Sequence, residues 1–429
     1  MSILLALVIL CLLLTIGLPV ALSLALAGAF GLWMHSGLDT LLGILVSGPG
    51  SAISSYELMT IPMFLLMAEF MTVSGIANSL FGAFAAWTGR MRGGLGVATA
   101  VTGAAFGAIS GSSTAAAATL SSCSLPSMIQ RGYQSDFAAG IVAISGTLAM
   151  LIPPSIAVIF YGLLSGADIG KLLIAGIIPG ALVTLTIALT IRFLLLRNPA
   201  LAPKGTGSTW REKVASLRVA GPFLALFAMV TGFIFTGIAT PVESSALGAI
   251  GALLLTIAYG RLDLRTLRTS VVNTCITSAM IGLIIVCAQI FGFFLTLTGA
   301  TQGLIRWVSS SEFSPYTVLV VLIALYLVLG CFLDQLSILI LTVPVVHPLV
   351  VSMGFDPIWF GIMIILLAEV GMVTPPVGMN VFIVARANRM PVTDVFRGVA
   401  PHVVAHLVLI LVFVLFPQLI TWLPGRMRG

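Results

Sequence analysis

Charged side chains are scarce in this sequence. Only 7% of the 429 residues are Asp, Glu, Lys or Arg, whereas soluble proteins carry roughly a quarter. Soluble enzymes, nucleic-acid-binding domains and disordered regulators need more charge than this at their surfaces, so these classes are excluded. The five cysteines all lie in apolar segments and show neither a CxxC pair nor a metal-type spacing. This pattern excludes a disulfide framework and a zinc site.

Apolar residues take the place of charge. They make up 59% of the chain, and the mean hydropathy is +1.19. Apolar runs of about 18 residues or more follow one another, and each is long enough to cross the ~30 Å hydrocarbon core of a bilayer as a helix. The sequence therefore predicts an all-α polytopic membrane protein. The N-terminus is apolar from Ile3 onward and lacks the basic segment of a signal peptide, so we expect a retained span.

One polar segment divides the chain. Residues 198–218 concentrate charge, Pro, Gly and Ser, and we interpret them as a cytoplasmic linker between a first repeat at 1–197 and a second at 219–429. An offset of 222 residues, as from Pro153 to Pro375, aligns the two halves at Pro and Gly residues that interrupt the apolar pattern. It matches Pro19-Val20 with Pro241-Val242, Pro126 with Pro348, Pro153-Pro154 with Pro375-Pro376, and Gly176 with Gly398. Self-similarity at one ungapped register indicates an internal duplication.

Each half contains two interruptions of its apolar pattern. In the first half we expect a re-entrant hairpin at about 93–131 and a broken helix at about 135–165. In the second half the corresponding segments are about 317–353 and about 358–386. If each hairpin enters and leaves on one side, each half crosses the membrane an odd number of times, so the repeats are predicted to be inverted. Matched broken helices in inverted repeats indicate the binding site of a secondary transporter.

The basic residues predict the orientation. With the N-terminus outside, only four of the 19 Lys and Arg residues lie outside, namely Lys171, Arg306, Arg426 and Arg428, and the others are cytoplasmic. This asymmetry follows the positive-inside rule. The first hairpin would then open from the cytoplasm and the second from the far side. The two arginines of the C-terminal tail do not fit the pattern.

Five segments carry a resemblance to a known family. They are Trp87-Thr-Gly-Arg-Met-Arg-Gly-Gly-Leu95, Phe106-Gly-Ala-Ile-Ser-Gly-Ser-Ser113, Gly146-Thr-Leu-Ala-Met-Leu-Ile-Pro-Pro-Ser-Ile156, Leu333-Asp-Gln-Leu-Ser-Ile-Leu-Ile-Leu-Thr-Val-Pro344 and Glu369-Val-Gly-Met-Val-Thr-Pro-Pro-Val-Gly-Met-Asn-Val-Phe382. With these segments the chain resembles, over nearly its whole length, the large membrane subunit of TRAP (tripartite ATP-independent periplasmic) transporters.

The resemblance implies a function and partners. It implies Na⁺-coupled uptake of a small organic acid, a carboxylate, across the bacterial inner membrane, by an elevator-like motion of the hairpin-bearing domain. A periplasmic substrate-binding protein would deliver the substrate. A small four-helix membrane subunit would accompany the chain; it is fused to the large subunit in some relatives and is expected here as a separate polypeptide. No nucleic acid, ATP or enzymatic reaction is implied.

The resemblance also implies site residues. Two Na⁺ sites are expected, and the first would use Ser110, Ser113, Ala149, Ile152 and Pro153. The second would use Gly330, Gly371, Thr374 and Val377, mostly through backbone carbonyls. Candidate substrate contacts are Ser112, Thr147, Ser155, Asp334 and Asn380. Ala149 stands where a glycine is common in the family, and a carbonyl ligand tolerates the change unless the position needs a positive φ.

Four acidic residues lie in apolar segments: Glu69, Glu243, Asp334 and Glu369. Each is costly at membrane depth and therefore a functional candidate. Glu243 follows Pro241 closely, so helix N-terminal capping is the preferred interpretation. Asp334 serves either substrate entrance and hairpin closure or the orientation of the hairpin tip.

Two further motifs are interpreted as structural. His402 and His406 are four residues apart, a spacing that can hold a metal, but no third ligand follows, so we expect interhelical hydrogen bonds. The segment Gly166-Ala-Asp-Ile-Gly-Lys171 lacks the spacing of a P-loop and the Ser or Thr after its Lys, so no ATP site is predicted.

Two alternatives stay open. The first is a standalone Na⁺-coupled carboxylate carrier of related architecture, which uptake by vesicles without any periplasmic protein would favour. The second, more remote, is an intramembrane enzyme built around Asp334, His347 or Glu369, although no nucleophile–base pair occurs at helical spacing. The identity of the organic acid is expected to depend chiefly on the binding protein.

Overall fold

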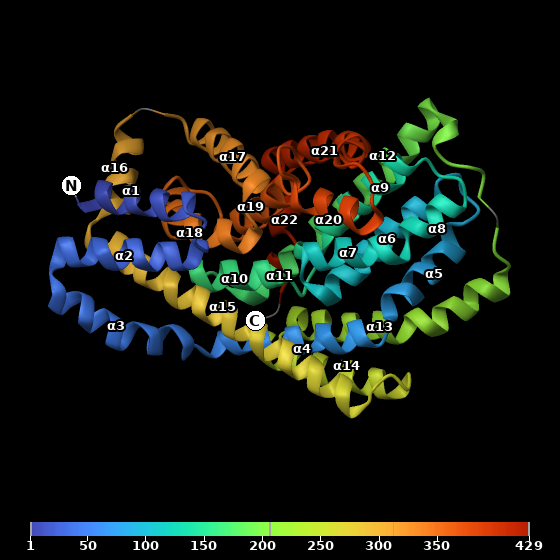
Figure 1. Ribbon diagram of the computed structural model, residues 1–429, viewed down its shortest axis with the longest axis horizontal. Helices are drawn as coiled ribbons and strands as arrows, with labels where there is room; N and C mark the ends of the chain where they lie inside the picture. The colour runs from blue at the N-terminus through green and yellow to red at the C-terminus, as the bar shows by residue number, and fades with distance from the viewer. Residues whose placement is uncertain (1, 206, 312, 428–429) are drawn as a thin grey trace.

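The computed structural model describes residues 2–205, 207–311 and 313–427, and every regular element within these ranges is helical (Figure 1). Eight of the described helical segments are long and apolar enough to cross a membrane. The prediction of an all-α, multi-pass membrane protein is therefore confirmed.

The helices of the first half of the chain are α1 (Ser2–Thr15), α2 (Val20–Ser36), α3 (Leu38–Ile53), η1 (Tyr56–Met59), α4 (Thr60–Val73), α5 (Ile76–Thr88), α6 (Gly94–Ser110), α7 (Ser113–Cys123), α8 (Leu125–Gln130), α9 (Ser135–Gly146), η2 (Thr147–Met150), α10 (Ile156–Ser165), α11 (Ile169–Ala175), α12 (Ile177–Arg197) and η3 (Pro199–Leu201). Those of the second half are α13 (Trp210–Thr236), α14 (Pro241–Ala258), α15 (Leu264–Leu297), α16 (Ala300–Ser310), α17 (Pro315–Phe332), α18 (Gln335–Ser352), α19 (Pro357–Gly371), α20 (Met379–Asn388), α21 (Val392–Leu415), α22 (Gln418–Thr421) and η4 (Pro424–Arg426).

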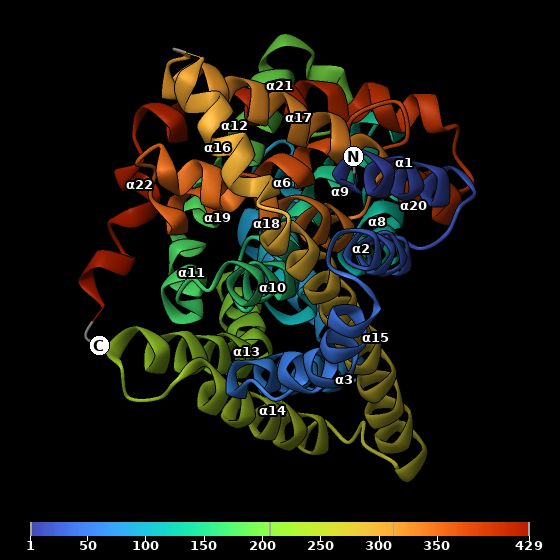
Figure 2. The same ribbon diagram turned by 90° about the vertical axis from the view of Figure 1, so that its left-hand side faces the viewer.

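One set of helices, here called the scaffold group, consists of α1–α5 with η1 and α13–α15. The long α15 runs beside α2, α3 and α4 and spans much of the molecule in Figures 1 and 2. Small residues allow this close packing, because a Cβ added to Gly28 of α2 would lie 2.8 Å from the Cα of Phe291 in α15. The Thr256 hydroxyl of α14 donates a hydrogen bond to the Phe70 carbonyl of α4 at 3.0 Å.

The second set, the hairpin group, consists of α6–α12 and α17–α22 with their short 3₁₀ turns. It holds most of the large side chains that are fully buried, including Phe160, Tyr161, Trp359, Phe360 and Phe413. Both groups combine helices from the two halves of the sequence. Neither half therefore packs as a unit by itself.

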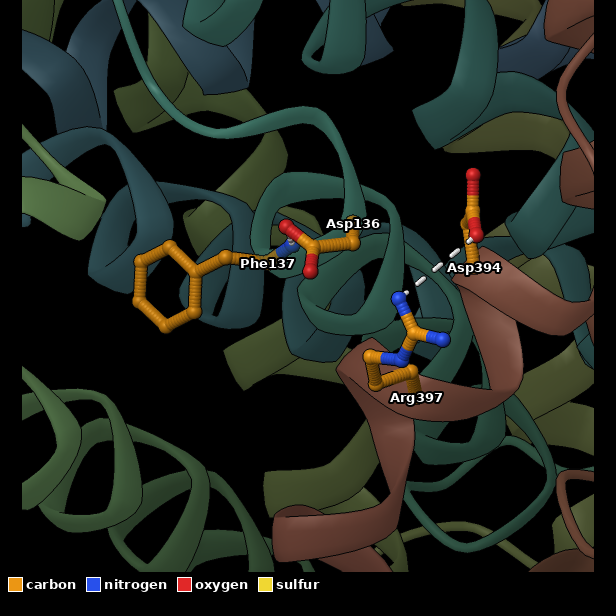
Figure 3. Close-up of polar contacts among 4 residues, drawn as sticks. All are labelled: Asp136, Phe137, Asp394 and Arg397. Carbon is orange, nitrogen blue, oxygen red and sulfur yellow. Dashed lines mark hydrogen bonds and ion pairs between the residues drawn. The ribbon is translucent and has the colours of Figure 1, made fainter.

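The closest helix crossing in the hairpin group joins α9 to α21. A Cβ added to Gly140 would lie 2.1 Å from the Gly398 carbonyl carbon, and one added to Gly398 would lie 1.9 Å from the Asp136 carbonyl oxygen. Figure 3 shows the rim of this crossing, where Arg397 and Asp394 of α21 form an ion pair at 4.0 Å near Asp136 of α9. Glycine at both positions is what lets the two backbones touch.

Replacement of Gly398 by valine is expected to destabilise the hairpin group, because the new side chain meets backbone atoms that cannot rotate away. Overpacking of this kind costs about 1–3 kcal/mol or more. The measurement is the melting temperature of the detergent-purified protein. Gly282→Val in α15 is the matched control, since a Cβ there has no neighbour within 4 Å. Equal melting temperatures for the two variants would contradict the prediction.

Two helices lie where hydropathy predicts no span. α3 and α16 follow α2 and α15 directly, and α16 buries Thr301 and Val308 while Trp307 on another face is exposed. Both helices are shorter than the 18-residue window used to detect membrane spans, because α3 has 16 residues and α16 has 11. The apolar segment at 169–197 is divided at Gly176 into α11 and α12.

Candidate functional site

Two tight turns form the tips of the predicted hairpins. α6 ends at Ser110, and Gly111 follows in the left-handed region with φ +54°, which a glycine adopts without strain. Ser112 then caps α7 by accepting a hydrogen bond from the Ala115 amide at 3.4 Å. The N-terminus of α7 therefore lies at the first tip.

The second tip is built around Asp334. Its carboxylate caps α18 by accepting a hydrogen bond from the Ser337 amide at 3.2 Å, and the Ser337 hydroxyl donates to the same carboxylate. Of the two roles considered for Asp334, orientation of the tip therefore has a structural basis. A role in substrate entrance stays a prediction.

The two prolines at each break stop a membrane helix in the same way. Pro153-Pro154 and Pro375-Pro376 supply no backbone N–H groups, so the preceding turns cannot continue into the following helix. Ser155 restarts the first helix as the N-cap of α10, and Gly378, with φ +59°, precedes α20. Both Pro-Pro bonds are cis.

Each hairpin packs against the break of its own half. A Cβ added to Gly107 of α6 would lie 2.5 Å from the Cα of Ala149, and one added to Gly330 of α17 would lie 2.8 Å from the Cα of Gly371. Ala149 and Gly371 are the positions that the 222-residue offset pairs. Two backbone-to-backbone contacts at related positions bring each tip beside the non-helical residues that follow.

The residues expected at the first Na⁺ site lie on the two segments that make this contact, the first tip and the first break. Ala149 and Pro153 are buried at the break, and a Cβ added to Gly111 of the tip would lie 3.4 Å from the Ile156 amide nitrogen. Ala149 adopts no positive φ, because Arg389 is the one non-glycine among the described residues that does. Alanine therefore costs nothing in backbone conformation at this position. Ser110 Oγ donates a long hydrogen bond to the Ser112 carbonyl at 3.4 Å.

Ser113 has partners that sequence reasoning missed. Its hydroxyl donates to Glu369 Oε2 at 2.7 Å and accepts from Asn380 Nδ2 at 2.6 Å. These partners belong to α19 and α20 of the second half, and all three side chains are buried. Asn380, predicted as a substrate contact, thus donates one of its amide hydrogens to Ser113. No motif spacing signals this contact, since 256 residues separate Ser113 from Glu369.

The second expected Na⁺ site lies where α17 meets the second break. Gly330 and Gly371 touch, and the Gly378 amide donates to the Cys331 carbonyl at 3.4 Å. The Thr374 hydroxyl donates to the Val370 carbonyl of its own helix at 2.6 Å. Its proton is therefore committed, whereas its lone pairs and backbone carbonyl are free to face a cation. Val377 is 39% exposed beside the break.

The remaining candidate substrate contacts have local partners. The Thr147 hydroxyl donates to the Ile144 carbonyl at 2.7 Å. The Ser155 hydroxyl donates to the Met150 carbonyl and accepts from the Val158 amide at 3.3 Å. These bonds orient both hydroxyls within the first broken helix.

The electrostatics of the site derive from helix ends. α7 and α18 begin at the two tips, and α10 and α20 begin just after the two breaks. A helix N-terminus carries a partial positive charge, so the N-terminus at each tip and after each break favours an anion beside it. In broken membrane helices of transporters, backbone carbonyls at the break commonly coordinate the coupling cation.

Two other predictions have clear outcomes. Glu243 and Thr240 form a reciprocal capping box at the start of α14, which confirms the capping role. The prediction of interhelical hydrogen bonds for His402 and His406 is wrong. His406 Nδ1 bonds the His402 carbonyl within α21 at 2.7 Å, and the other ring nitrogens of the pair have no hydrogen-bond partner in the described structure. The four-residue spacing places each ring over its own helix turn.

Comparisons with known proteins show which family the chain belongs to. Residues 7–419 match the family model described as "Tripartite ATP-independent periplasmic transporter, DctM component". The chain is 33% identical over 371 residues to the C4-dicarboxylate TRAP transporter large permease DctM of Pseudomonas aeruginosa, which covers 86% of each protein. It is 31% identical to the ectoine TRAP transporter large permease TeaC of Halomonas elongata, over 96% of each.

Two further comparisons concern a longer relative and a protein of known structure. The sialic acid TRAP transporter permease SiaT of Haemophilus influenzae is 32% identical over 87% of this chain, but the chain covers 61% of that longer protein. The crystal structure of the YdaH transporter of Alcanivorax borkumensis superposes with a TM-score of 0.68 at 14% identity and covers 90% of both chains, so it has a similar fold. With the family model matched over most of its length, the chain belongs to the DctM component family of tripartite ATP-independent periplasmic transporters.

Proposed function

We propose that this permease carries out Na⁺-coupled uptake of a small carboxylate across the bacterial inner membrane. The main support for this proposal is a contact between a hairpin and a broken helix that occurs in both halves, at Gly107–Ala149 and at Gly330–Gly371. Each contact packs a hairpin helix against backbone that leaves helical geometry at a Pro-Pro break, and all four residues are buried. Such oxygen-rich, non-helical backbone at membrane depth is typical of ion-coupled secondary transporters.

The two expected Na⁺ sites follow from the chemistry at these contacts. Na⁺ is a hard cation that prefers oxygen ligands, and the oxygens proposed for the first site are the hydroxyls of Ser110 and Ser113 and the backbone at Ala149, Ile152 and Pro153. The second break offers carbonyls near Gly330, Gly371, Thr374 and Val377. Bound Na⁺ would supply the charge that draws an anionic substrate between the tips, where the N-termini of α7 and α18 begin.

The substrate class follows from these charges and from the relatives. Relatives are named for C4-dicarboxylates, ectoine and sialic acid. A carboxylate group fits the helix N-termini at the tips, and Ser112, Thr147, Ser155, Asp334 and Asn380 are proposed to line its site. Because an ionised Asp334 would carry the same sign as a carboxylate substrate, the proposed cations would offset its charge during binding.

An elevator-type movement of the hairpin group against the scaffold group is supported by their loose interface. A cavity of about 490 Å³ separates Ser51, Gln289 and Phe293 of the scaffold group from Leu163 and His347 of the hairpin group. A second cavity, of about 600 Å³, separates Glu57 and Thr240 from Gly162 and Asp168. Both breaks and both tips move as one body in this proposal, so the bound ions and substrate travel together.

The family name itself implies two partners. We propose that a periplasmic binding protein delivers the substrate and that a separate, small four-helix membrane subunit packs on the scaffold group. The longer SiaT of Haemophilus influenzae is a single permease protein of which this chain covers 61%. The additional length of that relative is sufficient for a fused small subunit.

The proposed inverted repeats predict an orientation that labelling can measure. In a variant without native cysteines, Asp39→Cys should react with a membrane-impermeant maleimide added to whole cells, and Lys204→Cys should not. Both positions are exposed in the structure, and the asymmetry of Lys and Arg residues motivates the expectation. Arg428, counted on the outer side, lies outside the described residues. The reverse labelling pattern would contradict the proposed topology.

The direct test uses the assembled transporter in proteoliposomes. The permease, its small membrane subunit and its binding protein are combined with radiolabelled succinate, sialic acid or ectoine, and an inward Na⁺ gradient is compared with K⁺ of equal strength. Na⁺-dependent uptake that requires the binding protein is expected. Uptake without the binding protein would favour the standalone carrier, and equal uptake in K⁺ would contradict Na⁺ coupling.

A further inference from the structure

A buried polar bridge connects the tip of the first hairpin with the second broken helix. Ser113, the first residue of α7, shares its hydroxyl with Glu369 in the last turn of α19 and with Asn380 in the first turn of α20. The helices on both sides of the second break, α19 and α20, are therefore both hydrogen-bonded to the Ser113 Oγ atom. The relative exposures are 0% for Ser113, 1% for Glu369 and 0% for Asn380.

The bridge residues have few other partners. Glu369 Oε1 and Asn380 Oδ1 make no hydrogen bond in the described structure, and Glu369 forms no ion pair there. Buried polar groups are costly unless they are paired, and hydrogen bonds in a low-dielectric interior are correspondingly strong. The two bonds to Ser113 therefore determine how these side chains, and the helix ends that carry them, are oriented.

The hydroxyl of Ser113 can bridge and bind a cation at the same time. A serine hydroxyl has one donor hydrogen and two acceptor lone pairs. The hydrogen points to Glu369 and one lone pair accepts from Asn380, which leaves the second lone pair for a cation. Because hydrogen bonds polarise one another, donation to the Glu369 carboxyl oxygen makes the Ser113 oxygen more negative and thus a better ligand.

Ser113 belongs to the first proposed Na⁺ site, whereas its partners border the second. Glu369 lies two residues before Gly371, and Asn380 lies three residues after Val377. We propose that the bridge couples the two cation sites, so that Na⁺ at the first site orders the second. The inference rests on the proposed function. Coupling follows because an ion that fixes the Ser113 hydroxyl also fixes both ends of the second break, and the reverse holds by linkage.

The coupling runs through one bridge, since the related positions of the two halves differ. The 222-residue offset pairs Ser113 with Gln335 and Glu369 with Thr147. Gln335 Nε2 donates to the Ile365 carbonyl of its own half at 3.4 Å, and the Thr147 hydroxyl donates within its own helix. Neither residue makes a side-chain hydrogen bond to the other half in the described structure, so removal of the Ser113 bridge has no symmetric replacement.

The test measures binding of radioactive Na⁺ to the purified full-length permease with its small membrane subunit, at constant ionic strength in choline chloride. For two coupled sites we expect a Hill coefficient well above 1, with an upper limit of about 2. Glu369→Leu should lower the coefficient to about 1, because two uncoupled sites bind independently. Glu369→Gln should retain a coefficient above 1, since its amide oxygen can still accept from Ser113.

Two further variants keep the test decisive. Asn380→Leu removes the other arm of the bridge while the Glu369 carboxylate remains, and it should also lower the Hill coefficient. Gln335→Leu is the matched control: it removes a buried amide at the related position and should leave the coefficient unchanged. A merely structural role for Glu369 would reduce the amount of folded protein without changing the shape of the binding curve.

The outcomes separate the inference from the proposed function. If the unaltered protein binds no Na⁺, the proposed function fails and the coupling fails with it. If it binds Na⁺ cooperatively and both Glu369→Leu and Asn380→Leu keep that cooperativity, only the coupling by this bridge is overturned. A reduced Hill coefficient in both variants, with the control unchanged, supports the inference.

Discussion

Uptake by a permease carrying both Ser110→Ala and Ser113→Ala is expected to require at least about a hundredfold more Na⁺ for half-maximal rate. Each substitution removes one hydroxyl ligand at the first proposed site. A contact to a charged group contributes about 1.5–3 kcal/mol, and two such losses correspond to a hundredfold change or more. Few alternative oxygens exist at this tip, because Ser112 already caps α7. The measurement is the initial rate in proteoliposomes across a range of NaCl concentrations.

The single variants refine this first prediction. Ser110→Ala removes a hydroxyl whose one hydrogen bond, to the Ser112 carbonyl, is long at 3.4 Å. Ser113→Ala removes a ligand and the bridge to Glu369 and Asn380 together, so it should have the larger effect. Ser122→Ala with Ser127→Ala, in α7 and α8 away from the tip, is the matched control. Unaltered Na⁺ dependence in the double tip variant would place the first ion elsewhere.

Gly371→Val is expected to abolish transport. A Cβ at this position would lie 2.5 Å from the Gly330 Cα and 2.9 Å from the Leu327 carbonyl oxygen. Both are backbone atoms of α17, so the hairpin must separate from the broken helix. The separation would disperse the carbonyls proposed to bind the second Na⁺. Initial uptake rates, normalised to the amount of protein in the membrane, measure the effect.

Thr374→Val tests the same site with a smaller structural change, because valine keeps the shape of threonine and removes only the hydroxyl. The hydroxyl donates to Val370, so only its lone pairs are available to an ion, and their loss should raise the half-maximal Na⁺ concentration by about two- to tenfold, the range of an ordinary hydrogen bond. Gly282→Val in α15, where a Cβ has no neighbour within 4 Å, controls for the effect of a valine in a membrane helix. Normal Na⁺ dependence in both Gly371→Val and Thr374→Val would remove the second broken helix from the coupling mechanism.

The sequence by itself determined the class of the protein and the places where its helices stop. Scarce charge and long apolar runs require a bilayer, because such a surface cannot face water. Prolines without N–H groups must interrupt a helix at Pro153-Pro154 and Pro375-Pro376 wherever the rest of the chain lies. These properties are local, and the motifs around them were sufficient to identify the family.

Only the tertiary structure decided which distant side chains share a hydrogen bond. The same serine that the motif marks as an ion ligand could face either half of the molecule, and the packing of α7 against α20 turns it toward Glu369 and Asn380. The same is true of His402 and His406 in α21. Their four-residue spacing is compatible with hydrogen bonds to another helix or within their own helix, so the sequence does not distinguish the two. Sequence separation carries no information on such contacts, because they depend on how distant helices pack, as at the close backbone approaches of Gly140–Gly398 and Gly330–Gly371.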